Sequence, residues 1–293
     1  MSAKQTNRKP GEVETTGHSW DGIEEYNNPL PKWWLYIFYI CIVFSIVYSV
    51  LYPAWPMLTR ATPGILGYST RGALAADMQR FNEQQQPMRD KLVATPLDQV
   101  QNDPELLQFA QDAGAAVFRT NCAQCHGSGA AGVQAGGFPN LLDDDWLWGG
   151  SLDDIVTTVT HGVRNSDDSD ARYSQMPAFG KDGLLTPEQV GAVVQYVMSF
   201  SNAATDQALV PEGQQIFADN CSACHGEDGK GDRAQGAPNL TDAIWLYGGD
   251  QATLTNTVTN ARFGVMPSWK LRGMSDSDIR AVALYVHGLG GGE

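Results

Sequence analysis

The chain has 293 residues and a formal net charge of −14 at pH 7, from 33 acidic and 19 basic side chains. This acidic balance argues against nucleic acid as a partner and favours a basic protein partner. The length is too great for one small domain and suits two domains of about 100 residues plus further segments.

An uncharged apolar stretch from Trp33 to Tyr52 predicts a membrane-spanning helix. At 1.5 Å per residue it extends roughly 30 Å, the hydrocarbon thickness of a bilayer. Aromatic side chains at both ends suit the membrane interfaces, and Pro53 ends the helix. A cleaved signal peptide does not fit, because the stretch is too long and starts too late in the chain. We therefore predict an N-terminal segment at 1–31 and a lipid-embedded anchor at 32–56.

Residues 57–104 predict a connector between the anchor and the first domain. Thr62-Pro63-Gly64 breaks regular structure, and residues 82–86 form a polar run. Between them, three apolar residues lie on one face of a short amphipathic helix, namely Leu74, Met78 and Phe81. The sequence leaves open whether this segment docks against a membrane partner or acts as a spacer.

The sequence Cys-x-x-Cys-His occurs twice, at 122–126 and 221–225. In the attachment site of a c-type haem, both cysteines form thioethers to the porphyrin and the histidine is the proximal iron ligand. A zinc site or a redox dithiol would need further ligands or a βαβ context, and neither is visible. We therefore expect two covalent haem c groups, with iron ligands His126 and His225. The attachment residues are Cys122, Cys125, Cys221 and Cys224.

The two motifs belong to an internal repeat with an offset of 99 residues. The same offset relates further pairs of identical residues, including Gly114 to Gly213, Pro139 to Pro238 and Trp146 to Trp245. We predict domains at 105–202 and 207–293. Each opens with an amphipathic helix before its motif and closes with a helix, started by Thr186-Pro187 in the first and by Ser275-Asp276 in the second.

A sixth iron ligand decides between an electron carrier, whose iron is closed, and an enzyme or sensor, whose iron is open. Met176 and Met266 are the best candidates, because each precedes a proline in the loop between the motif and the closing helix. We expect each to serve the haem of its own repeat. Core filling is the alternative role for a single methionine. Weaker candidates are Met198, Met274 and His161, and the second repeat has Asn260 in place of His161.

Two arginines, Arg164 and Arg262, are candidates for pairing with haem propionates, with ordinary solvated roles as the alternative. The loop before Met176 is also longer than its counterpart and carries an acidic insertion around Asp167, Asp168 and Asp170. This insertion is either a docking patch for a cationic partner or a solvated loop.

Both repeats resemble single-haem class I cytochromes c. The stretch from Thr16 to Trp34, together with the apolar helix and Tyr52-Pro53-Ala54-Trp55-Pro56, resembles the N-terminal signature of the di-haem cytochrome c subunit of cbb3-type oxidases. This resemblance covers nearly the whole chain. It implies an all-α fold, with one N-terminal transmembrane helix followed by two tandem class I cytochrome c domains.

The resemblance also implies a role in respiration. The chain would accept electrons from a soluble or membrane cytochrome c and relay them through a mono-haem cytochrome c subunit. A haem-copper subunit would then reduce oxygen and pump protons, so the chain itself is not expected to hold the oxygen-reducing site. Because haem c is attached outside the bacterial cytoplasm, we expect an inner-membrane protein with a cytoplasmic N-terminus and periplasmic haem domains.

Three alternatives stay open at this point. An anchored di-haem cytochrome c of a dehydrogenase or nitrogen-oxide reductase would share every haem feature, and only the N-terminal signature separates it. A di-haem peroxidase would need one iron with an exchangeable sixth position. A haem sensor of oxygen or nitric oxide would need a stable ligand complex at one ferrous iron.

Overall fold

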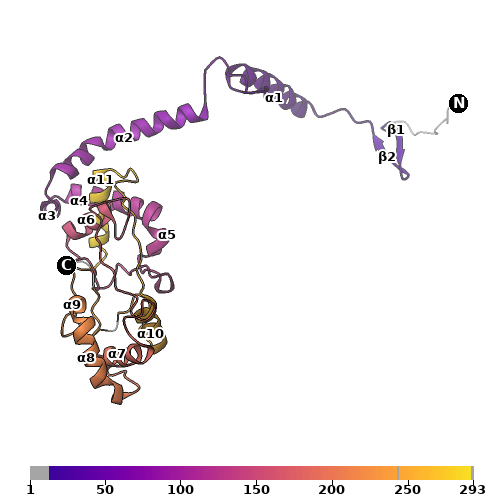
Figure 1. Cartoon of the computed structure of the whole chain (residues 1–293). Coiled ribbons are helices and arrows are strands. Elements are labelled where there is room, and N and C mark those ends of the chain that lie inside the picture. Colours follow the sequence, from indigo (N-terminus) through magenta and orange to yellow (C-terminus); the bar gives the residue numbers. More distant parts are fainter. Residues whose placement is uncertain (1–12, 243, 292–293) are drawn as a thin grey trace. The chain divides into compact units, whose positions relative to one another are not determined.

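The computed structural model describes residues 13–242 and 244–291. The chain divides into two compact units, residues 1–83 and 84–293. The start of the predicted segment 1–31 and the end of the predicted domain 207–293 lie outside the described residues. Apart from one β-hairpin and isolated bridges, regular structure in the described part is helical, which confirms the predicted all-α class (Figure 1).

The first unit contains a hairpin that the sequence analysis did not predict. Strand β1 (Thr15–Trp20) pairs antiparallel with β2 (Ile23–Tyr26). Asp21 and Gly22 join them at φ values of 51° and 84°. An Asp-Gly pair favours such a tight turn, so a signal for the hairpin was present in the sequence.

Helix α1 (Lys32–Leu51) follows the hairpin, and none of its side chains is buried in the structure. Its mean hydropathy is 2.2, and it is long and apolar enough to cross a membrane. An apolar helix with no covering protein surface requires an apolar surrounding, which supports the membrane anchor. The chain then folds back at Gly64, where the amides of Ile65 and Leu66 donate to the carbonyl oxygens of Val50 and Leu51 at 3.0 and 3.1 Å.

The connector forms a longer helix than predicted. Helix α2 (Thr70–Ala94) runs through the polar residues 82–86 and contains Pro87. Side-chain hydrogen bonds one turn apart, from Gln79 to Glu83 at 2.8 Å and from Gln86 to Asp90 at 2.7 Å, stabilise it locally. The polar run therefore continues the helix, since glutamine and glutamate are good helix formers.

The second unit holds both haem motifs in two groups of helices, which we call the first and second lobes (Figure 1). The first lobe comprises α4 (Pro104–Val117), α5 (Ala123–His126), α6 (Leu152–His161) and α11 (Asp276–His287). The second comprises α7 (Pro187–Ser199), α8 (Val210–Asn220), α9 (Ser222–His225) and α10 (Gln251–Asn260). Shorter elements are α3 (Leu97–Val100), a π-turn at Phe118–Cys122 and 3₁₀ turns at Gln134–Gly136 and Gln207–Leu209.

The structure corrects the expectation that each repeat closes with its own helix. Helix α11, from the second repeat, packs against α4 of the first, and α7, from the first repeat, packs against α8 of the second. The crossings are close because Gly114 lies on the backbone of Ala281 and Gly213 on that of Ala192, with no room for a Cβ atom. The predicted domains 105–202 and 207–293 are sequence repeats, whereas each lobe combines parts of both.

The short connection between α7 and α8 explains this exchange. Gln195, which is only 2% exposed, accepts from the amides of Thr205 and Asp206 at 2.8 and 3.0 Å. The chain is thereby held against α7 and enters α8 beside it, in keeping with the tendency of consecutive elements to pack together. With α8 covered by α7, α11 is left to cover α4. The predicted starts of both closing helices are confirmed, since Thr186 caps α7 and Ser275 caps α11.

The two lobes also exchange aromatic contacts. The ring of Trp148 lies against Gly236, and the ring of Tyr247 lies against Gly137. The repeat offset relates these two contacts, so they are reciprocal. Gly236 has φ +62° and Gly137 has φ +68°, so each position needs glycine for its backbone conformation as well as for space.

We expect Gly236→Ala to destabilise the second unit, because the added methyl group would overlap the Trp148 ring. The haem-loaded chain in detergent should lose about 2 kcal/mol, which lowers its melting temperature by about 5 °C. Gly183→Ala is the matched control, because Gly183 has φ +70° and a methyl group added there would meet no atom within 4 Å. Equal melting temperatures for the two variants would contradict the inter-lobe contact.

Candidate haem sites

Both Cys-x-x-Cys-His motifs lie where an opening helix ends. In the first lobe the chain passes from α4 through the π-turn into α5, and in the second it passes from α8 directly into α9. Cys122 and Cys221 lie half-buried against the two hydrophobic cores, whereas Cys125 and Cys224 are exposed. Burial, with a smaller contribution from the neighbouring cysteine, raises the pKa of Cys122 and of Cys221 to about 11. Each motif thus presents one half-buried and one exposed thiol.

The proximal histidines are oriented by the same bond in both lobes. His126 Nδ1 lies 3.1 Å from the carbonyl oxygen of Pro139, and His225 Nδ1 lies 3.1 Å from that of Pro238. Burial lowers the pKa of both imidazoles, against a smaller opposing effect of the proline carbonyl. The neutral ring therefore donates through Nδ1–H, and Nε2 keeps a lone pair for a metal. This arrangement is the one that an iron-ligating histidine requires.

Tight loops bring those prolines back to the histidines. In the first lobe, Gly132 N donates to the His126 carbonyl oxygen at 2.8 Å, and in the second, Gly231 N donates to the His225 carbonyl oxygen at 2.8 Å. Gly132 has φ +69° and Gly231 has φ +80°, and a Cβ at either would overlap backbone atoms of the returning part of the loop. The carbonyl oxygens of Pro139 and Pro238 thus each accept from a specific donor, the imidazole of the motif.

The candidate distal methionines are exchanged like the closing helices. Met266 packs against the first-lobe core, which includes Phe118 and borders Cys122. Its amide and carbonyl exchange two hydrogen bonds of 3.0 Å with Val163 of the first repeat. Met176 packs against the second-lobe core, which also borders Cys221. Each methionine therefore packs against the core that borders the motif of the other repeat, and its role as an iron ligand stays a prediction.

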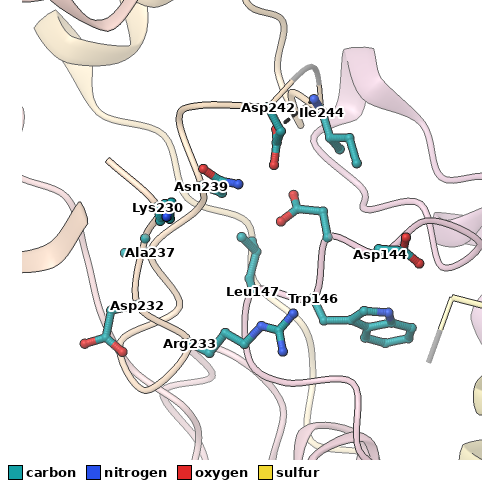
Figure 2. Close-up of a pocket in the computed structure, with 12 residues that line it drawn as sticks. Asp144, Trp146, Leu147, Lys230, Asp232, Arg233, Ala237, Asn239, Asp242 and Ile244 are labelled. Carbon is teal, nitrogen blue, oxygen red and sulfur yellow. Dashed lines mark hydrogen bonds between the residues drawn. The ribbon is translucent and has the colours of Figure 1, made fainter. Parts of the chain in front are cut away.

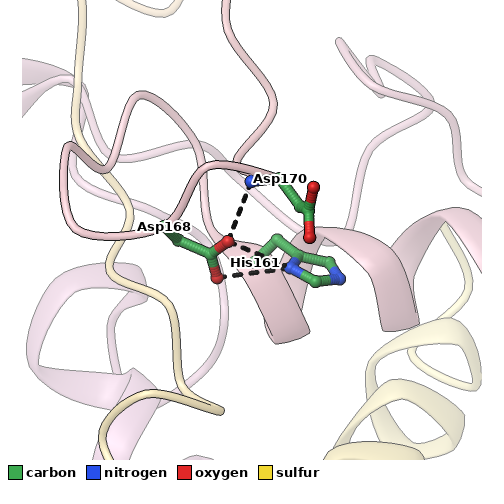
Figure 3. Close-up of side chains that lie close together, drawn as sticks. All are labelled: His161, Asp168 and Asp170. Atoms are coloured by element: carbon green, nitrogen blue, oxygen red, sulfur yellow. Dashed lines mark hydrogen bonds and ion pairs between the residues drawn. The ribbon is translucent and has the colours of Figure 1, made fainter.

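The weaker candidates have other surroundings. Met198 is buried within α7, and Met274 borders the first-lobe core. His161, at the end of α6, has its Nδ1 3.2 and 3.3 Å from the two carboxylate oxygens of Asp168, with Asp170 beside them (Figure 3). A carboxylate of the acidic insertion thus holds the His161 ring through an ion pair or hydrogen bond. In the described part of the chain, these three residues form the one group of histidine, cysteine and carboxylate side chains close enough to share a metal ion, and it includes no cysteine.

The two candidate propionate partners differ in their contacts. Arg164 donates to two backbone carbonyls, from Nε to Gly264 at 2.7 Å and from Nη1 to Ser174 at 3.1 Å. The Arg262 guanidinium lies 5.2 Å from the ring centroid of Tyr247. A propionate contact stays a prediction for both residues.

A cavity of about 660 Å³ lies between loops of the two repeats, and the sequence did not predict it (Figure 2). Asp145 and Trp146 line it from the first repeat, and Lys230, Arg233 and Asp242 line it from the second. Burial and the nearby carboxylates of Asp242 and Asp143 raise the pKa of Asp145 to about 6, against the opposing charge of Arg233. The sequence shows a run of three aspartates here, but only folding sets one of them opposite Asp242.

Asp145 gives the folded chain a pH-dependent stability. Folding raises the pKa of Asp145 from 3.8 to about 6, so the folded state favours the protonated carboxyl. The stability that this carboxyl contributes to the folded chain is fully present below pH 3.8 and is lost as the pH rises through 6. Asp145→Asn should therefore stabilise the chain by about 1 kcal/mol at pH 8, after allowance for solvent screening, with no gain at pH 4. Thermal unfolding at both pH values measures this difference. Asp144→Asn, at an exposed neighbour, should show no such pH dependence, and a pH-independent effect of Asp145→Asn would contradict the prediction.

Comparison with known proteins agrees with this geometry. The family model described as the N-terminal domain of cytochrome oxidase-cbb3, FixP, matches residues 12–59. The model described as cytochrome c oxidase, cbb3-type, subunit III, matches residues 109–197 and 208–286, which are the two repeats.

Full-length relatives carry the same description. A cbb3-type cytochrome c oxidase subunit CcoP of Cereibacter sphaeroides is 62% identical over 293 residues and 100% of both chains. The CcoP subunit of Rhodobacter capsulatus is 54% identical over 100% of both chains, and the FixP subunit of Sinorhizobium medicae is 52% identical over 96% of both. With its apolar anchor helix and its cytochrome c repeats, which imply bound haem c, the chain belongs to the family of subunit III of cbb3-type cytochrome c oxidases.

Proposed function

We propose that the chain binds two haem c groups and is the membrane-anchored electron-transfer subunit of a cbb3-type oxidase. It would accept electrons from a cytochrome c donor and pass them toward the oxygen-reducing subunit. The observation that carries this proposal is the equivalent bonding of both motif histidines, with Nδ1 at 3.1 Å from a proline carbonyl oxygen in each lobe. Two histidines that are oriented by the same hydrogen bond, each in a motif with two cysteines, support two haems.

The packing supports a specific set of ligands. His126 with Met266 would hold the iron of the first lobe, and His225 with Met176 that of the second. Cys122 with Cys125, and Cys221 with Cys224, would attach the porphyrins. A haem c bound in this way supplies a one-electron iron couple, and ligation by both histidine and methionine leaves no position for a substrate. This favours electron transfer over peroxidase or sensor chemistry.

The anchor helix and the net charge support a location in the membrane and a choice of partners. With α1 as a single bacterial inner-membrane span, the segment 1–31 would lie in the cytoplasm and the haem unit in the periplasm, where haem c is attached. The partners would be the mono-haem cytochrome c subunit and the catalytic haem-copper subunit. The net charge of −14 favours a donor cytochrome with a basic docking face.

The exchanged ligands can be tested in chains with a single haem. We start from Cys221→Ala combined with Cys224→Ala, which leaves only the first attachment motif. In this background Met266→Leu should abolish the red absorption band of methionine-ligated ferric haem and lower the reduction potential, because methionine ligation raises the potential. Met176→Leu is the matched control and should leave both unchanged. The opposite result would restore pairing within each repeat.

The assignment to an oxidase is tested by purification of a tagged chain from solubilised membranes. We expect b-type haem, copper and oxygen consumption with reduced cytochrome c as donor to co-purify with it. A preparation that holds only c-type haem, or that brings down a dehydrogenase or nitrogen-oxide reductase, would refute this assignment while leaving the cytochrome fold intact.

A further inference from the structure

One arginine contacts both loops that carry the candidate distal methionines. Arg164 Nε donates to the Gly264 carbonyl oxygen at 2.7 Å, and its Nη1 donates to the Ser174 carbonyl oxygen at 3.1 Å. Gly264 lies two residues before Met266, and Ser174 lies two residues before Met176. A single planar guanidinium thus connects the corresponding points of the two loops.

We propose that Arg164 is a positioning residue that holds both methionine loops, so that methionine ligation at the two irons is coupled through one side chain. The inference rests on the ligand set of the proposed function. It differs from the propionate role considered for this residue, because a propionate contact concerns one haem, whereas the two carbonyl contacts concern both.

The backbone around Arg164 is itself built into these loops. Val163 exchanges two hydrogen bonds with Met266, and Arg164 N donates to the Arg172 carbonyl oxygen at 2.7 Å. Arg164 has φ +51°, a left-handed conformation that is unfavourable for a residue with a Cβ atom. Such a conformation persists where the surroundings hold it, and here it places the side chain between the two loops.

The chemistry of the site suits arginine and no shorter or more compact cation. The fork of the guanidinium offers separate donors in fixed directions, whereas a lysine ammonium is a single point of charge on a flexible stem. Burial lowers the pKa of Arg164, with smaller opposing effects of Tyr247 and Tyr173, so the group is partly withdrawn from water. Hydrogen bonds from a charged donor in such surroundings are stronger than neutral ones.

The contact is not duplicated by the repeat. The offset of 99 residues places Phe263 at the position that corresponds to Arg164, and this residue is 48% exposed. Both loops therefore depend on the one residue that the first repeat supplies. Removal of this side chain should loosen Met176 and Met266 together, although they belong to different lobes.

The test uses the whole chain in membranes and measures the methionine absorption band of each haem separately. The variant Met266→Leu keeps only the methionine band of the second-lobe haem, and Met176→Leu keeps only that of the first-lobe haem. Arg164→Leu is introduced into each background, with Arg164→Lys as a variant that retains the charge. Arg119→Leu is the matched control, because Arg119 is an exposed arginine of the first repeat. Covalent haem content verifies that each variant is assembled.

We expect Arg164→Leu to cause loss of the remaining methionine band in both backgrounds and a fall in the potential of that haem, since methionine ligation raises the potential. Arg164→Lys should give a partial loss in both, because it restores charge without the second directed donor. Arg119→Leu should leave both bands intact.

Other outcomes overturn the proposal. Bands that persist in Arg164→Leu with normal haem content would refute it, and so would a loss confined to one background, which would indicate a propionate contact or a role in one loop. If Arg164→Leu does not assemble, unchanged bands in Arg164→Lys would refute the proposal instead. Failure of the proposed function looks different, because the chain without substitutions would then lack the methionine bands altogether.

Discussion

The crossing of an opening helix by a closing helix is the contact on which both lobes depend. In each lobe a glycine of the opening helix, Gly114 or Gly213, lies directly on the backbone of the closing helix. The aromatic residues Phe118 and Tyr285 pack beside one crossing, and Phe217 and Tyr196 pack beside the other. Because the haem motif continues from the opening helix, this crossing fixes where the motif begins and which core its first cysteine faces.

The exchange of closing helices makes the second unit one cooperative structure. Neither repeat contains a complete lobe, so unfolding of either repeat would remove the closing helix that covers the opening helix of the other. The end of α2 and helix α3 add to the first lobe, where Leu92, Leu97 and Val100 are buried against Leu106 and Leu284. Arg89 and Asp278 form an ion pair of 2.9 Å across the same junction. The connector is therefore part of the fold at its C-terminal end.

The same exchange has a consequence for electron transfer. If each iron takes its histidine from one repeat and its methionine from the other, a change at one haem alters segments that also belong to the other lobe. The reciprocal contacts of Trp148 with Gly236 and of Tyr247 with Gly137 hold the lobes in contact. Within this interface Arg164 joins the two methionine loops directly. Contacts of this kind hold the two candidate haem sites in a fixed relation.

Local features of the sequence predict much of the fold and of the candidate sites. The spacing of Cys122, Cys125 and His126 predicts haem c attachment. The charge-free run 33–51 of α1 requires an apolar surrounding, and the caps at Thr186 and Ser275 act within a single turn. Each of these signals depends on residues that are neighbours in the chain. The offset of 99 residues likewise revealed two equivalent modules.

Contacts between distant segments could be seen only in the folded chain. The repeat makes Met176 and Met266 equivalent, so sequence periodicity cannot tell which of them packs against the core beside Cys122 and which against the core beside Cys221. That choice follows from the short connection held by Gln195, which directs α7 onto α8 and leaves α11 and the Met266 loop for the first lobe. The burial of Asp145 opposite Asp242 and the two contacts of Arg164 follow from the same packing. The residue pattern thus predicts the chemistry of each repeat. Only folding selects which closing helix and which methionine loop pack against each opening helix, because helix packing depends on which surfaces are already covered.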